Sequence, residues 1–122
     1  MSFPSLNLIT LFVNDPLKSC AFYTQLFGLD PVEKSETFAL FALPNGTMLG
    51  LWSPVTADPP AEVKAGGCEV SFEEENVDEL HDKWVKMGIV ISQPPTEMDF
   101  GRTFVGLDPD GHRLRVYRLR AH

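Results

Sequence analysis

The chain has 122 residues, a hydrophobic fraction of 43% and a formal net charge of −7. The length suits one globular domain, and the charge argues against nucleic acids or anionic membranes as main partners, because both attract basic surfaces. Neither a basic leader nor an apolar run of about eighteen residues is visible, so we expect a cytoplasmic protein. Cys20 and Cys68 are isolated, which favours reduced thiols over a disulfide.

The first half of the chain predicts a strand, a helix and further strands. An alternating run over residues 8–13 predicts the first strand, and a helical pattern follows it up to Gly28. Two more strand-like runs, 38–43 and 47–52, flank a turn sequence at residues 44–46.

The second half repeats this order. Residues 69–72 predict a strand, and an apolar stripe with spacings of three, four and three predicts a helix that stops at Gly88. Three strand-like runs follow the helix, the last two joined by the turn sequence at 108–111: residues 90–91, 103–107 and 112–117. Each half therefore predicts a strand, a helix and three strands.

Capping signals support both helices. Asn14 or Asp15 can cap the first, and Pro16 suits the first helical position because a backbone donor is not needed there. Asn76 can cap the second, in which acidic residues lie in the first turn and lysines in the last. Both helices are expected to begin at these residues.

The segment 54–66 is rich in proline, alanine and glycine and predicts a tether between two modules, residues 1–53 and 67–122. A chain this short buries only about two-thirds of its unfolded surface, so half-units with one helix each must share a core or borrow one from a partner chain. We therefore expect a homodimer, and the tether could let the modules exchange between subunits.

Several segments together resemble the vicinal oxygen chelate superfamily, which includes glyoxalase I, extradiol dioxygenases, fosfomycin resistance enzymes and metal-free bleomycin resistance proteins. The resemblance covers nearly the whole chain and rests on residues 13–28, 76–78 and 108–114. It implies an α+β fold in which two βαβββ modules form a curved, cup-like mixed sheet. Residues 51–53, 100–104 and 108–112 are similar, more narrowly, to phenazine antibiotic resistance proteins within that superfamily.

The resemblance also locates the corners where metal enzymes of the superfamily hold their ion. The matching residues here are Leu8, Gly50, Glu69 and Arg115. Of these only Glu69 could bind a metal, whereas a catalytic site needs about three His, carboxylate or thiolate ligands. We therefore expect no metal and no other cofactor. The histidines do not have ligand spacing, and they are expected to be surface, turn and tail residues: His81, His112 and His122.

Strand parity predicts which side chains point into the cup, because alternate residues face opposite sides of a sheet. The inward set is Leu8, Thr10, Phe12, Met48, Gly50, Trp52, Glu69, Ser71, Arg113, Arg115 and Tyr117. Their neighbours, which are apolar and should face the helices, are Ile9, Leu11, Val13, Leu49, Leu51, Val70, Phe72, Leu114 and Val116. An apolar set of this kind is what a sheet packed under helices requires.

The inward residues suit a flat aromatic ligand that carries a polar or acidic substituent. Gly50 leaves space where a metal-binding side chain would stand, and Trp52 either stacks on the ligand or fills core. The candidate ligand-binding residues are Phe12, Met48, Gly50, Trp52, Glu69, Phe100, Arg102, Arg115 and Tyr117.

Two roles stay open for the charged and loop residues among these candidates. Glu69 and Arg115 either contact the ligand or form an internal ion pair that replaces the metal. Residues 93–102 predict a loop, from which Phe100 and Arg102 either close the mouth of the cup or act as core cap and brace.

The leading hypothesis is a metal-free protein, without catalytic residues, that sequesters or carries an aromatic antibiotic or a similar small molecule. The alternative is a metal-dependent enzyme of the glyoxalase or dioxygenase type. A third hypothesis is metal-free catalysis with Glu69 as general base and Arg115 stabilising an oxyanion.

Overall fold

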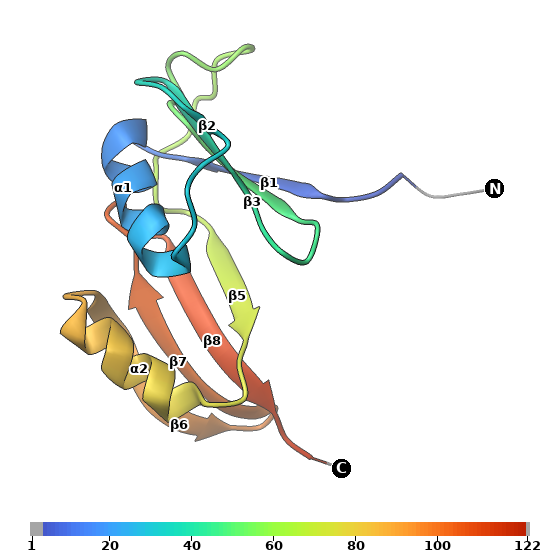
Figure 1. Ribbon diagram of the computed structural model, residues 1–122, viewed down its shortest axis with the longest axis vertical. Helices are drawn as coiled ribbons and strands as arrows, with labels where there is room; N and C mark the ends of the chain where they lie inside the picture. The colour runs from blue at the N-terminus through green and yellow to red at the C-terminus, as the bar shows by residue number, and fades with distance from the viewer. Residues whose placement is uncertain (1–3, 122) are drawn as a thin grey trace. The chain divides into compact units, whose positions relative to one another are not determined.

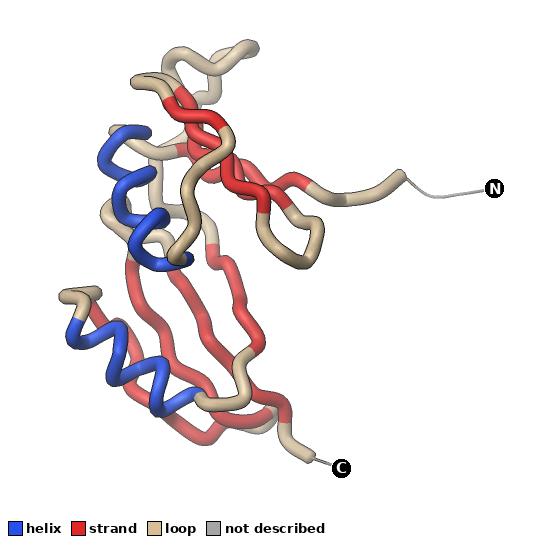
Figure 2. Tube along the Cα trace, in the orientation of Figure 1, coloured by secondary structure: helices blue, strands red, loops and turns tan. Residues whose placement is uncertain are grey.

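The computed structural model describes residues 4–121 and divides into two compact units, Met1–Gly66 and Gly67–His122. Each unit contains one helix and one four-stranded mixed sheet (Figures 1 and 2). The α+β class and the strand, helix, three strands order of each half are confirmed. His122 lies outside the described residues. Within residues 4–121, no helix has the length and apolar composition needed to cross a membrane.

The first unit is built around the sheet order β1-β4-β3-β2, in which β1 runs parallel to β4 and the other pairs are antiparallel. Its elements are β1 (Leu8–Phe12), α1 (Pro16–Phe27), β2 (Glu33–Lys34), β3 (Phe38–Ala42) and β4 (Met48–Trp52). The short edge strand β2 is the first of the three strands after α1, and the sequence analysis assigned no particular residues to it.

Helix α1 begins and ends where the sequence predicts. Of the two candidate caps, Asp15 is the one used, because its carboxylate accepts the backbone N–H of Lys18 at 3.2 Å. Gly28 ends the helix in the left-handed conformation, and its N–H donates to the carbonyl of Thr24. Tyr23, which is fully buried, packs against the rings of Phe27 and Phe41 and joins α1 to its sheet.

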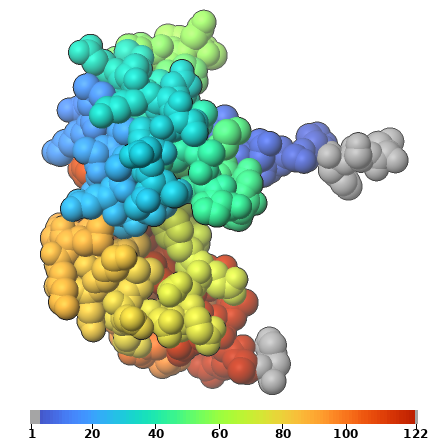
Figure 3. Space-filling view, viewed as in Figure 1, coloured from blue at the N-terminus to red at the C-terminus, as the bar shows by residue number. Residues whose placement is uncertain are grey.

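The second unit has the matching sheet order β5-β8-β7-β6, again with one parallel pair, β5 with β8. Its elements are β5 (Glu69–Glu73), α2 (Val77–Lys86), β6 (Val90–Met98), β7 (Gly101–Leu107) and β8 (Arg113–Leu119). The side chains of α2 cover much of the sheet behind them in the space-filling view (Figure 3).

Trp84 anchors α2 on that sheet. It is 4% exposed and makes edge-to-face ring contacts with Phe72 and Phe104, at centroid distances of 6.5 and 5.1 Å. A Cβ at Gly106 would come within 2.9 Å of the indole, so a glycine is required under the ring. Asn76 occupies the N-cap position without a side-chain cap hydrogen bond, so the predicted cap contact of this helix is wrong.

The predicted loop over residues 93–102 is also wrong. Strand β6 continues to Met98 and β7 begins at Gly101, which leaves only a tight turn between them. The pairing of β6 with β7 shifts register twice, on either side of Gln93, and β6 is an edge strand. Prolines at 94 and 95 are tolerated there because an edge strand with irregular pairing does not need every backbone donor.

Part of the predicted tether is folded back by local hydrogen bonds. The N–H groups of Thr56 and Ala57 donate to the carbonyl of Ser53, and Ala57 is 4% exposed. Among residues 54–66 there is no helix or strand.

Burial follows the predicted strand parity in both sheets. The residues assigned to the helix side are buried or half-buried: Ile9, Leu11, Val13, Leu49, Leu51, Val70, Phe72, Leu114 and Val116. The opposite side of each sheet, which we name the helix-free face, carries the residues predicted to point inward. These are exposed or half-buried, except for Gly50, which is buried.

Candidate functional site

Charged side chains gather on the helix-free face of the second unit. Glu69 pairs with Arg113, with 2.9 Å between Oε1 and Nε, and with Arg115, with 3.1 Å between Oε2 and Nε. Strand pairing explains the arrangement, since Glu69 lies opposite Arg113 and Ser71 lies opposite Arg115 in the parallel β5–β8 ladder. We name Glu69, Arg113 and Arg115 the arginine cluster.

Neutral side chains hold Arg115 in place. Its Nη1 donates to Oε1 of Gln93 at 3.2 Å and to Oγ1 of Thr103 at 3.1 Å. The Thr103 hydroxyl donates in turn to the carbonyl of Val116 at 2.7 Å, and Thr103 is fully buried. Sequence analysis missed Gln93 and Thr103, because strand parity was not extended to β6 and β7. Arg115 is therefore a fixed cation, with 16% of its side chain exposed.

The predicted ion pair between Glu69 and Arg115 is present, in the wider form of a carboxylate shared by two guanidiniums. Glu69 is the only metal-binding side chain among the four corner residues, and two cations already occupy its oxygens. Tyr117 lies on the same helix-free face, where strand pairing sets it opposite Glu73 and Thr103.

Aromatic side chains form a row across the helix-free face of the first unit. Phe12 lies opposite Trp52 in the β1–β4 pair, and Phe38 lies opposite Trp52 in the β3–β4 pair. The Phe38 and Trp52 rings meet edge to face, with centroids 5.8 Å apart. Met48 is on the same face at the other end of β4. We name Phe12, Trp52 and Phe38 the aromatic row.

Gly50 lies beside this row, but the space above it is narrower than predicted. A Cβ at Gly50 would lie 3.3 Å from the ring of Phe38 and 3.3 Å from the hydroxyl of Thr10. Because Gly50 has no side chain, the ring of Phe38 can pack closely over β4 at this position. Phe38 belongs to a predicted strand, and its alternation with buried Ala39 and Phe41 could have assigned it to this face.

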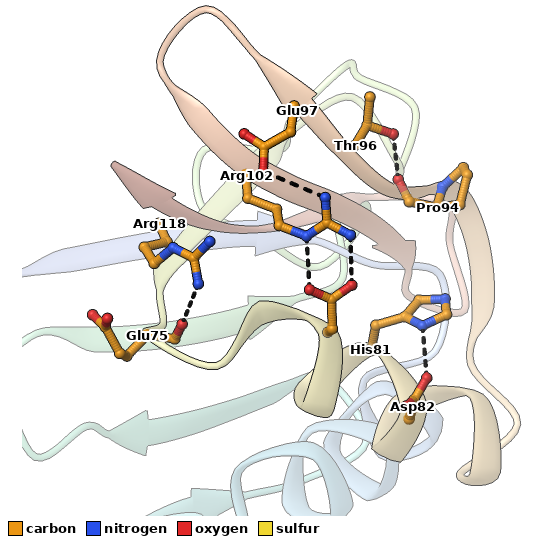
Figure 4. Close-up of polar contacts among 9 residues, drawn as sticks. Glu75, His81, Asp82, Pro94, Thr96, Glu97, Arg102 and Arg118 are labelled. Carbon is orange, nitrogen blue, oxygen red and sulfur yellow. Dashed lines mark hydrogen bonds and ion pairs between the residues drawn. The ribbon is translucent and has the colours of Figure 1, made fainter. Parts of the chain in front are cut away.

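The structure places Arg102 on the helix side of its sheet. Its Nε and Nη2 donate to the two carboxylate oxygens of Asp78, both at 2.7 Å, and Nη1 donates to Glu97 at 3.4 Å (Figure 4). The hydrogen bonds from Arg102 lower the pKa of Asp78, and the pairing raises the pKa of Arg102. This geometry is that of a brace between α2 and β7. Phe100 lies in the β6–β7 turn and is 38% exposed.

His112 differs from its predicted role as an ordinary turn residue, because it is buried and paired. Its Nδ1 lies 2.8 Å from Oδ2 of Asp108, while Oδ1 accepts the N–H groups of Asp110 and His112 at 2.9 Å. The three side chains lie close enough for a common ion, with ligand atoms within 4.8 Å of one another. In the structure, the carboxylate oxygens of Asp108 take part in hydrogen bonds that close the turn between β7 and β8.

Several known proteins are similar to this chain. The model of the Glyoxalase/Bleomycin resistance protein/Dioxygenase superfamily matches residues 5–116. The chain is 33% identical over 120 residues to the phenazine antibiotic resistance protein EhpR of Enterobacter agglomerans, covering 93% of this chain and 91% of that protein. It is 32% identical to the glutathione transferase FosA of Serratia marcescens, covering 93% and 79%.

Among solved structures, protein ATC0852 of Agrobacterium tumefaciens matches with a TM-score of 0.85 and 46% identity, covering 99% of this chain and 100% of that one. The match to the family model spans both units. This chain therefore belongs to the Glyoxalase/Bleomycin resistance protein/Dioxygenase superfamily.

Proposed function

We propose that this protein binds a planar aromatic molecule of the antibiotic type without a metal ion. By sequestering the molecule, it would protect the cell from it. The main observation behind the proposal is that most of the residues at the predicted metal corners have no metal-binding group. Leu8, Gly50 and Arg115 offer no metal ligand, while aromatic side chains line the helix-free face of the first unit. The similarity to EhpR supports a role in antibiotic resistance.

The aromatic row supplies the recognition of a flat ring. Trp52 is half-buried, so part of its indole is accessible, and Phe38 braces it from one edge. Stacking on an indole contributes about 0.5–1.5 kcal/mol beyond the area it buries, and a braced ring needs little reorganisation on binding. Phe12, which pairs with Trp52, extends the apolar surface across the sheet, and Met48 adds apolar surface at the other end of β4.

On the second unit, taken by itself, the candidate ligand contacts are charged and polar side chains. The arginine cluster and Tyr117 present hydrogen-bond donors on a helix-free face, and Phe100 remains a candidate contact from the adjacent turn. Arg102 is assigned to the brace with Asp78 and not to the ligand. The expected homodimer is part of the proposal, and sedimentation equilibrium would test it.

Isothermal titration calorimetry with phenazine tests the proposed function directly. We expect binding tighter than about 1 mM and at least a tenfold loss in Trp52→Leu. Phe22→Leu is the matched control, since it removes an aromatic ring from α1, outside the helix-free face. Sequestration of planar aromatics is refuted if wild-type protein binds no phenazine in this range, or if both variants lose affinity equally.

The similarity to FosA supports a second candidate, a metal-dependent transferase. Elemental analysis of protein purified without chelators separates the two candidates. A transferase site should retain about one divalent ion per subunit, whereas the proposed binding protein should retain none and should bind phenazine unchanged after treatment with a chelator.

A further inference from the structure

We propose a second binding site in this protein, a pocket at the end of β8 that takes a phosphate group, either free or as the monoester of a small molecule. All of its residues belong to the second unit, and three arginines line it: Arg102, Arg118 and Arg120. Its volume of about 440 Å³ falls within the range of small-molecule sites. We name it the β8-end pocket, and it is separate from the helix-free faces to which aromatic binding is assigned.

The first of these arginines is already neutralised. Arg102 lies directly opposite Arg118 in the antiparallel β7–β8 pair, where two like charges repel. Asp78 offsets the charge of Arg102 through two hydrogen bonds of 2.7 Å, and Glu97 lies 3.4 Å from its Nη1. Arg102 therefore forms a wall of the pocket and leaves the anion to the other two arginines.

Arg118 and Arg120 pair with no carboxylate in the described part of the chain. Arg118 donates Nη1 to the backbone carbonyl of Glu75 at 3.0 Å (Figure 4). Arg120 donates Nη2 to the backbone carbonyl of Met98 at 3.2 Å. A carbonyl is neutral, so both guanidiniums keep their full charge, and most of their N–H groups remain available to an oxyanion. Two uncompensated cations in one pocket are notable in a chain whose formal charge is −7.

The backbone that carries these two arginines is held in position. The N–H of Arg120 donates to the carbonyl of Phe100 at 2.8 Å, beside the start of β7. Gly101, the first residue of β7, has a φ of +145°, and a Cβ there would overlap the carbonyl oxygen of Arg118. Only glycine permits this close approach of the two strands. Binding therefore has to order two side chains but no backbone.

A phosphate group suits this pair of cations better than a carboxylate does. Phosphate monoesters carry about 1.5–2 negative charges near neutral pH and offer three acceptor oxygens, enough for both guanidiniums. A carboxylate carries a single charge, and one bidentate arginine can occupy both of its oxygens. The carboxylates of Glu75 and Glu97 also line the pocket, and they would repel a polyanion such as a nucleic acid more strongly than a single phosphate.

Isothermal titration calorimetry tests the site with three probes: glycerol 3-phosphate, inorganic phosphate and glycerate. The buffer has a pH of about 7.5, where the phosphates are largely dianions, and about 20 mM salt, which limits screening. At least one phosphate should bind with a Kd below about 1 mM, and glycerate should bind at least tenfold more weakly. The tighter of the two phosphates identifies whether the group is recognised free or as a monoester.

Four variants locate the binding. Arg120→Met should weaken phosphate binding at least tenfold, and because this side chain is exposed the variant should fold. Arg118→Met should have the same effect, with circular dichroism as the check on folding. Glu75→Gln removes a negative charge from the pocket and should strengthen binding severalfold. Arg113→Met is the matched control, since it deletes the same charge from the helix-free face and should leave the Kd within twofold.

The outcomes decide the site and its ligand class separately. Equal affinity for glycerate and the phosphates would overturn the phosphate class. The site itself is disproved if neither phosphate binds in this range, or if Arg113→Met and Arg120→Met lose affinity equally. No aromatic compound is used in the experiment, so a negative result leaves the proposed aromatic binding standing, and a failure to bind phenazine leaves this site standing.

Discussion

Thr103 is the residue whose replacement best tests how the arginine cluster is supported. Its hydroxyl donates to the carbonyl of Val116 at 2.7 Å and accepts Nη1 of Arg115 at 3.1 Å, and the residue is fully buried. Thr103→Val keeps the shape and removes both bonds. Leaving buried partners unsatisfied costs about 1–3 kcal/mol, so we expect a loss of that size in the free energy of unfolding.

The measurement is denaturant unfolding with linear extrapolation, and Thr10→Val is the matched control. Thr10 also lies on a helix-free face, where its hydroxyl makes no side-chain hydrogen bond to residues 4–121, so the control should change stability by less than about 0.5 kcal/mol. In an Arg115→Met background, Thr103→Val should cost at least about 0.5 kcal/mol less. Equal losses in Thr103→Val and Thr10→Val would refute the supporting role.

Two further changes test the packing and charge of the second unit. Gly106→Ala would put a Cβ 2.9 Å from Trp84 and should cost about 1–3 kcal/mol of unfolding free energy, whereas Gly67→Ala, with open space around it, should cost far less. Asp78→Asn tests the brace with Arg102. The pKa of Asp78 in the folded state lies below its ordinary value of 3.8. The stability that the ionised Asp78 adds is therefore present above about pH 4 and is lost as the pH falls through the lowered pKa. Thermal unfolding from pH 6 to pH 2 should show the wild-type advantage shrinking, and an advantage that is constant with pH would contradict the pairing.

Features set by neighbours along the chain were predictable from sequence. The alternation of Leu11 and Val13 with Thr10 and Phe12 assigned the two faces of β1 correctly, because side chains in a strand must alternate. Asp15 with Pro16 marked the start of α1 for an equally local reason, since an N-cap bonds within one turn.

Features that join distant residues were not predictable in this way. The bidentate bond of Arg102 to Asp78 spans 24 positions, and the predicted alternatives of lid and brace could not be separated without it. The support of Arg115 by Thr103 depends on the register of β7 against β8. The extension of β6 through its two prolines depends on its place at the edge of the sheet.

Residue type and local order were enough to predict the repeated strand and helix pattern and the family resemblance, and to expect residues without metal-binding groups at the metal corners, namely Leu8, Gly50 and Arg115. Tertiary structure alone decided that Glu69 is shared by two arginines and that Phe38 leans over Gly50. The physical reason is that strand register sets which side chains meet across a sheet, and register is fixed only when the whole sheet is packed.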